Sequence, residues 1–85
     1  PEPLNSIGNN LRIIEGAKEQ WALENRKQPG DAVRLSDLTT YFKNSTIPAS
    51  IANETYSVTK VGELARAVLP EKVNGKSGPL TTTSF

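Results

Sequence analysis

The 85-residue sequence contains no cysteine, no histidine and no methionine. Without cysteine there is no thiol catalysis and no disulfide, and without histidine there is no imidazole for acid–base chemistry or for most transition-metal sites. Few enzyme mechanisms remain after these absences. We therefore expect no enzymatic activity and no cofactor.

Neither sign of charge is in excess, because 10 Lys and Arg residues are balanced by 9 Asp and Glu residues and the formal net charge is +1. A nucleic-acid-binding surface or capture by anionic lipid would require a clear basic excess. No run approaches the roughly 20 apolar residues that span a bilayer. Acidic residues are sparse after Glu54, so no calcium-type loop is expected. The sequence thus predicts neither a nucleic-acid partner nor a metal site.

The strongest helical signal is the stretch NNLRIIEGAKEQWALENRK, residues 9–27. At 100° per residue, a stripe about 100° wide collects the apolar residues Leu4, Ile7, Leu11, Ile14 and Trp21. Asn5 or Ser6 could cap this helix, and Pro29-Gly30-Asp31 is expected to end it. We predict a helix over 5–27, with Leu11, Ile14 and Trp21 as core anchors. Trp21 as a ligand platform is the less favoured alternative.

Ser36 followed by Asp37 is typical of an N-cap with an acidic first turn, and predicts a short second helix over 37–43. Its apolar face, formed by Leu38, Tyr41 and Phe42, should pack on the first helix.

In TYSVTK, Tyr56 and Val58 alternate with polar residues, which predicts a strand with these two as core anchors. After a turn at 61–63, LARAVL is expected to return as the antiparallel partner. Asn74-Gly75 predicts a further hairpin turn, and PLTTTSF a third strand at the edge. Together these elements predict one α+β domain over 1–85, in which a small antiparallel sheet within 55–85 covers one face of the long helix.

Several words of the sequence occur in an order that resembles a known family: NNLRIIEGAKEQWALENRK, LSDLTTYFKN, a proline, ETYSV and KVGE. They resemble the periplasmic part of prepilin-type proteins, relatives of the type IV pilins and the type II secretion pseudopilins. The resemblance covers Asn9 to Glu63, about two thirds of the chain, and GAKEQWALEN is its most specific word. The segment after Leu64 does not contribute to it.

The resemblance implies a pilin-like fold and a structural subunit of a pilus or a type II secretion pseudopilus in the bacterial cell envelope. It also implies a leader and an apolar anchoring helix ahead of Pro1, in a precursor anchored in the inner membrane with this domain periplasmic or extracellular. The implied partners are identical or related pilin-like subunits. Many relatives carry a cysteine pair at the positions of Ser50 and Ala67, and here both cysteines are absent.

Ile13, Gly16 and Leu23 lie on another side of the helix from the Trp21 stripe, and we take them as a hypothetical subunit interface. The alternative is that they are ordinary scattered surface residues. Lys18 interrupts the core stripe and is expected to lay its methylenes over the rim with its ammonium in water. Glu15, Glu19 and Glu24, with neighbouring basic residues, are expected to form a solvated helix face.

A second functional interpretation remains open. The chain could be a non-enzymatic periplasmic or extracellular binding module that captures a peptide or a polysaccharide. Its binding surface would then be the exposed sheet edge or the loop over 44–54.

Overall fold

The protein is α+β in a computed structural model that describes residues 3–50, 53–70, 72, 75 and 79–84. The elements are the helix α1 (Pro3–Glu24), the 3₁₀ helices η1 (Leu35–Tyr41), η2 (Lys43–Ser45) and η3 (Thr82–Ser84), and the strands β1 (Thr55–Ser57) and β2 (Arg66–Val68). Among the described helices, none combines the length and the apolar character needed to cross a membrane.

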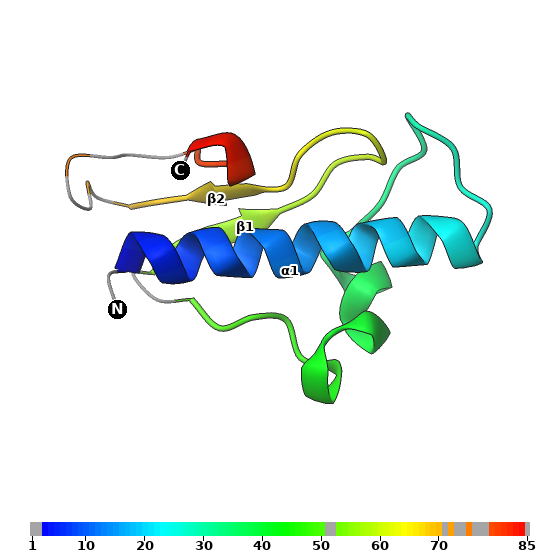
Figure 1. The fold of residues 1–85 in the computed structure, drawn as a ribbon, viewed down its shortest axis with the longest axis horizontal. Helices are drawn as coiled ribbons and strands as arrows, with labels where there is room; N and C mark the ends of the chain where they lie inside the picture. Colours follow the sequence, from blue (N-terminus) through cyan, green and yellow to red (C-terminus); the bar gives the residue numbers. More distant parts are fainter. Residues whose placement is uncertain (1–2, 51–52, 71, 73–74, 76–78, 85) are drawn as a thin grey trace.

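Figure 1 shows α1 running the length of the molecule, with β2 and η3 along one side and η1 and η2 along another. The 22 residues of α1 extend about 33 Å at 1.5 Å per residue, against a longest dimension of 39 Å. Residues of β2, η1 and η3 each approach α1 directly. The smaller elements therefore pack around the long helix.

The core forms on one face of α1, as the apolar stripe predicts. Ile7, Leu11 and Ile14 have no exposed surface, and Trp21 is buried about two turns further on. The side chain of Leu4 lies outside the described part of the chain. Ala17 and Ala22 of α1 also belong to this core. The rest of the described chain contributes Val33, Leu38, Phe42, Tyr56, Ala65, Ala67, Leu69 and Leu80.

The ends of α1 differ from the predicted 5–27. The helix begins at Pro3, so neither Asn5 nor Ser6 caps it, and it ends at Glu24, before Pro29 is reached. At the end, Lys27 N–H donates to the Ala22 carbonyl at 2.8 Å and Arg26 N–H to the Leu23 carbonyl at 3.4 Å. Arg26 has φ 55°, so this is a Schellman ending with an arginine in the left-handed position that glycine usually takes.

The second helix is a 3₁₀ helix that starts two residues earlier than predicted. Its N-cap is Arg34, whose N–H donates to Asp37 Oδ2 at 3.0 Å, so Ser36 lies within the helix and Asp37 supplies the capping carboxylate. Serine, threonine and aspartate favour local hydrogen bonds over α-helix continuation, which accounts for the tighter geometry. Leu38 is fully buried and Phe42 nearly so, and η1 packs against α1 as expected.

The Pro29-Gly30-Asp31 turn pairs with the chain after β1 instead of ending α1. Gly30 N–H donates to the Val61 carbonyl at 2.8 Å, Val61 N–H to the Asp31 carbonyl at 2.9 Å, and Val33 N–H to the Thr59 carbonyl at 3.1 Å. Gly30 and Gly62 adopt φ of +95° and +94°, which explains the glycine in each turn. Two turns predicted separately are thus joined by backbone hydrogen bonds.

The sheet has two strands in antiparallel register, with Tyr56 opposite Ala67. The predicted third strand is wrong: Leu80 forms a single bridge with Ala67, through hydrogen bonds of 2.8 and 2.7 Å, and the chain then turns into η3. There Thr81 N–H donates to Ser84 Oγ at 2.9 Å, because hydroxyl side chains compete for the backbone donors that a strand would use. Of the predicted Asn74-Gly75 turn, Asn74 lies outside the described residues and Gly75 has φ +82°.

Candidate functional site

The side of α1 turned away from the core carries the three residues of the predicted interface. Ile13 is 43% exposed and Leu23 is 76% exposed. A Cβ added at Gly16 would meet no heavy atom within 4 Å, so the helix backbone there is open to close approach. At 100° per residue these three positions fall within about 80° of the helix circumference. The structure thus places them together on one open face.

The remainder of this face is polar. Asn9, Arg12, Glu19 and Gln20 are exposed, and Gln20 donates to Glu24 Oε2 at 2.7 Å. Glu24 Oε1 also accepts the Tyr41 hydroxyl at 2.9 Å. The hydrogen bond from Gln20, and then that from Tyr41, lowers the pKa of Glu24. The open face therefore combines fixed polar groups with a few apolar positions.

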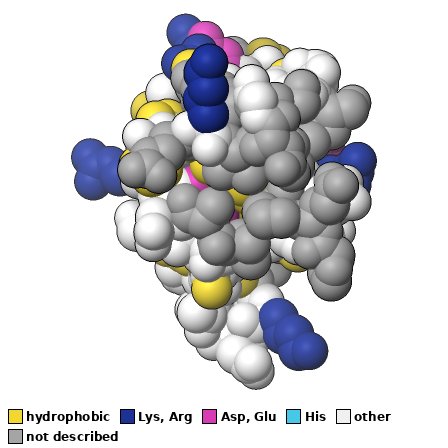
Figure 2. Space-filling view, turned by 90° about the vertical axis from the view of Figure 1, so that its left-hand side faces the viewer, with side chains coloured by type: hydrophobic (Ala, Val, Ile, Leu, Met, Phe, Trp, Pro, Cys, Tyr) yellow, Lys and Arg dark blue, Asp and Glu magenta, His cyan; other side chains and the backbone are white. Residues whose placement is uncertain are grey.

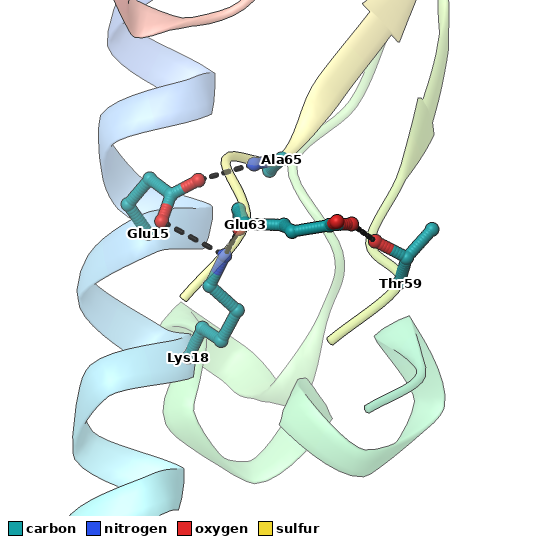
Figure 3. Close-up of polar contacts among 5 residues, drawn as sticks. All are labelled: Glu15, Lys18, Thr59, Glu63 and Ala65. Atoms are coloured by element: carbon teal, nitrogen blue, oxygen red, sulfur yellow. Dashed lines mark hydrogen bonds and ion pairs between the residues drawn. The ribbon is translucent and has the colours of Figure 1, made fainter. Parts of the chain in front are cut away.

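Opposite this face, the loop between the strands is fastened to α1 by a buried lysine (Figure 3). Lys18 Nζ lies 3.0 Å from Glu15 Oε1 and also donates to the Glu63 carbonyl. The other oxygen of Glu15 accepts the Ala65 N–H. Lys18 is only 4% exposed, so the prediction of a solvated ammonium is wrong. We call Glu15, Lys18 and the backbone of 63–65 the lysine junction.

Burial of Lys18 follows from its position inside the apolar stripe of α1, where a charge needs partners to be tolerated. Glu15 comes from the preceding helical turn and supplies the countercharge, while the loop supplies the carbonyl. The side chain of Glu63 points instead to Thr59, which donates to its Oε1 at 2.6 Å (Figure 3). That hydrogen bond is the main cause of the lowered pKa of Glu63, and Lys60 at 3.6 Å assists it.

The lysine junction borders a hollow of about 330 Å³, lined by Glu15, Lys18, Glu19, Val61, Gly62, Glu63 and Leu64. Glu15 is already held by Lys18 and the Ala65 N–H, and Glu63 by Thr59 and Lys60. Within the described ranges, His, Cys, Asp and Glu form no group of three or more that could hold a metal ion. The arrangement fastens a loop to a helix.

A second hollow of about 320 Å³ lies between α1 and the segment after η1. We call it the α1–loop groove, and it is lined by Asn10, Ile13, Phe42, Lys43, Asn44, Thr46, Ile47, Pro48 and Ala49. Most of its wall is apolar, and Asn10 closes one end by donating to the Ala49 carbonyl at 3.1 Å. Ile13 thus belongs both to the open face and to this groove.

Asn10 also joins a buried polar cluster with β1. Its amide donates to the Tyr56 hydroxyl at 3.0 Å, and that hydroxyl donates in turn to Glu54. Burial, then the hydrogen bond to Glu54, raises the pKa of Tyr56 above its ordinary value of 10.0. Glu54 is 4% exposed, and sequence reasoning gave it no role. The hydrogen bonds of this cluster hold α1, the loop and the sheet together.

The predicted core anchors differ in burial. Leu11, Ile14, Trp21 and Tyr56 are buried, whereas Val58 is partly exposed and lies beyond the end of β1. The Trp21 ring carries Lys27 Nζ at 5.5 Å from its centroid. Trp21 therefore packs in the core with a cation over its ring, and it is not a free platform.

Figure 2 shows the end of the molecule from which α1 starts. Among the described residues of this view, Lys and Arg side chains project separately around the edge, and hydrophobic side chains appear as small separate patches. A basic groove that could follow a nucleic-acid backbone is not seen among them.

The candidate site is the open face of α1 together with the α1–loop groove. In comparisons with known proteins, no family model matches the chain, and no match to a curated protein or to a solved structure reaches significance.

Proposed function

We propose that the chain is a structural subunit of pilin-like type, which assembles in the cell envelope by packing α1 against other subunits. The observation that carries the proposal is the one-sided burial of α1. Ile7, Leu11 and Ile14 are fully covered by the rest of the chain, whereas Ile13 and Leu23 on the same helix remain exposed. A helix of 22 residues with one open side offers a long surface for contact between subunits.

The lysine junction gives further support. The word GAKEQ contains Lys18, and the word VGE contains Glu63, 45 residues away in the chain. These two words carry much of the resemblance to prepilin-type proteins, and they meet at this contact. The words therefore describe how a loop is fastened to the long helix, which is what a shared fold would need.

The proposal includes a pilus or a type II secretion pseudopilus as the assembly and a membrane anchor ahead of Pro1. The gene sequence upstream of Pro1 tests the anchor: we expect roughly 20 apolar residues after a short basic leader. An upstream region that encodes only polar sequence contradicts the membrane-anchored part of the proposal.

Assembly is tested with charged substitutions on the open face. Ile13→Glu and Leu23→Glu should each reduce self-association at least tenfold, because each places a charge at the contact between subunits. NMR amide spectra recorded up to roughly millimolar concentration detect association as weak as Kd ~1 mM. Val68→Glu is the matched control, since Val68 is 46% exposed but lies on β2.

Ile13→Glu and Leu23→Glu should keep the Trp21 fluorescence and the unfolding midpoint of the unchanged chain, because exposed positions contribute little to the core. Unchanged association in Ile13→Glu and Leu23→Glu contradicts the proposal. Loss of association in Val68→Glu alone moves the contact from the helix to the sheet.

The α1–loop groove favours a second candidate, a non-enzymatic binding module for a peptide or a polysaccharide. Apolar walls with a few polar groups suit such a ligand. NMR amide spectra distinguish the two candidates at the groove residues. A binding module should show chemical-shift changes when a peptide or an oligosaccharide is added. A subunit should show them when the concentration of the chain itself is raised.

A further inference from the structure

The α1–loop groove is walled by Ile13 from α1 and by Ile47 and Pro48 from the loop. Its volume of about 320 Å³ exceeds what one aliphatic side chain fills. Lys43 stands on its wall, is exposed, and makes no ion pair with any described residue. The groove thus offers an apolar slot with a positive charge beside it.

The loop wall is held in a costly conformation. Asn44 and Ser45 are consecutive residues with φ of 58° and 53°, in the left-handed region that asparagine adopts more readily than other side chains and that serine disfavours. Ser45 N–H donates to the Phe42 carbonyl at 2.9 Å and Thr46 N–H to the Lys43 carbonyl at 3.2 Å, which keeps the two turns in place. Strained backbone of this kind collects at ligand-holding segments. It sets the wall that carries Lys43 and Ile47.

The complementary feature lies at the other end of α1. Leu23 is 76% exposed, the highest value among the large hydrophobic residues that the structure describes. Glu19, one helical turn earlier, is exposed and also makes no ion pair with a described residue. Leu23 and Glu19 thus present an apolar knob beside a negative charge, which matches an apolar slot beside a positive charge.

We infer that Leu23 of one copy docks into the α1–loop groove of a second copy, with Glu19 facing Lys43 across the contact. This inference rests on the proposed assembly function and names the two surfaces that meet. Knob and groove are different patches of the same chain, so with neighbouring α1 helices parallel the contact is head-to-tail and does not close on a two-fold axis. In such a pair one copy keeps a free groove and the other a free knob, so the contact can repeat along a fibre.

The contact also fixes a spacing. Leu23 lies 10 residues after Ile13 and 13 after Asn10, the two α1 residues of the groove. For parallel α1 helices, neighbouring copies are therefore offset by roughly 15–20 Å along the helix axis, at 1.5 Å per residue.

Cysteine cross-linking tests the pairing, and the chain has no cysteine of its own to interfere. Leu23→Cys and Ala49→Cys change one exposed residue each, on the knob and on the groove. Under mild oxidation we expect an equimolar mixture to give at least fivefold more cross-linked dimer than either variant alone. If Leu23→Cys alone cross-links as well as the mixture, the helices meet symmetrically and the inference fails, while the assembly proposal stands.

Charge reversal provides a second measurement. Lys43→Glu and Glu19→Lys should each weaken association several-fold, and the double variant should recover most of the loss because the charge pair is restored. Arg12→Glu, an exposed charge on α1 outside the groove, is the matched control and should show no recovery with Lys43→Glu. Independent effects of the two reversals overturn the pairing of Glu19 with Lys43.

Two further outcomes concern the whole scheme. If the chain associates but gives no cross-link to Ala49→Cys, Leu23 does not occupy the groove and the inference fails. If the unchanged chain does not associate, both proposals fail.

Discussion

Replacing Lys18 by methionine tests the lysine junction, because methionine keeps the length and the apolar stem but removes the ammonium. Lys18 is 4% exposed, and its loss leaves the Glu15 carboxylate and the Glu63 carbonyl without their shared donor. Removing one partner from a buried ion pair costs about 3–5 kcal/mol. Glu15 keeps the Ala65 N–H and retains 19% side-chain exposure, so water offsets part of this cost. We expect a loss of about 2–3 kcal/mol in the free energy of unfolding.

That loss is large for a protein of 85 residues, whose total stability is about 4–13 kcal/mol. Urea unfolding followed through the single Trp21 should show the midpoint falling by about 1–2 M with an unchanged slope.

The matched partner is the double variant Lys18→Met with Glu15→Gln. Glutamine can still accept the Ala65 N–H but leaves no unpaired charge, so the double variant should be more stable than Lys18→Met alone by about 1 kcal/mol or more. A Lys18→Met protein within about 0.5 kcal/mol of the unchanged chain refutes the reasoning, since that is the range of an ordinary surface change. Strictly additive losses in the double variant refute the ionic part of it.

Two further predictions concern the backbone and the tyrosines. Arg26→Gly should raise the free energy of unfolding by about 1 kcal/mol, because Arg26 has φ 55° and glycine takes that conformation without a Cβ penalty. Thermal unfolding measures this gain, and Arg26→Ala is the control for loss of the side chain. The pKa of Tyr56 is raised in the folded state by burial, so its contribution to stability is complete below about pH 10 and is lost as pH rises further, when the unfolded tyrosine ionises first. In a 295 nm titration Tyr56 should ionise only with unfolding and after the partly exposed Tyr41, whose pKa is also raised, by its hydrogen bond to Glu24. Tyr56→Phe should flatten the alkaline stability loss. An early, reversible ionisation of both tyrosines contradicts this prediction.

The core side of α1 could be predicted from the sequence because helix periodicity alone fixes which residues share a face. Ile7, Leu11, Ile14 and Trp21 follow that period, and all four are buried. The exact helix end could not be predicted, because the left-handed residue that ends a helix is usually glycine or asparagine, and here it is Arg26 next to Asn25.

Contacts between segments far apart in the sequence could not be predicted either. Lys18 interrupts the apolar stripe, and Glu15 was visible as a neighbour at i−3, but the Glu63 carbonyl comes from 45 residues away. Glu54 gave no local signal, since its side chain is buried by tertiary packing and accepts the Tyr56 hydroxyl. The segment near Leu80 alternates too weakly to decide between strand and turn, and hydroxyl side chains decide it in favour of η3.

The covering of α1 by later segments has a consequence for biosynthesis. Within these 85 residues α1 is made before the elements that pack on it, and the strand β2, the bridge at Leu80 and η3 come only from residues 66–84. On the ribosome the part of the apolar face that β2, Leu80 and η3 cover stays exposed until those residues have emerged. A nascent chain stopped before Leu80 presents that part to chaperones and to other nascent chains. The helix α1 therefore reaches its native surroundings only after β2 and η3 have been made.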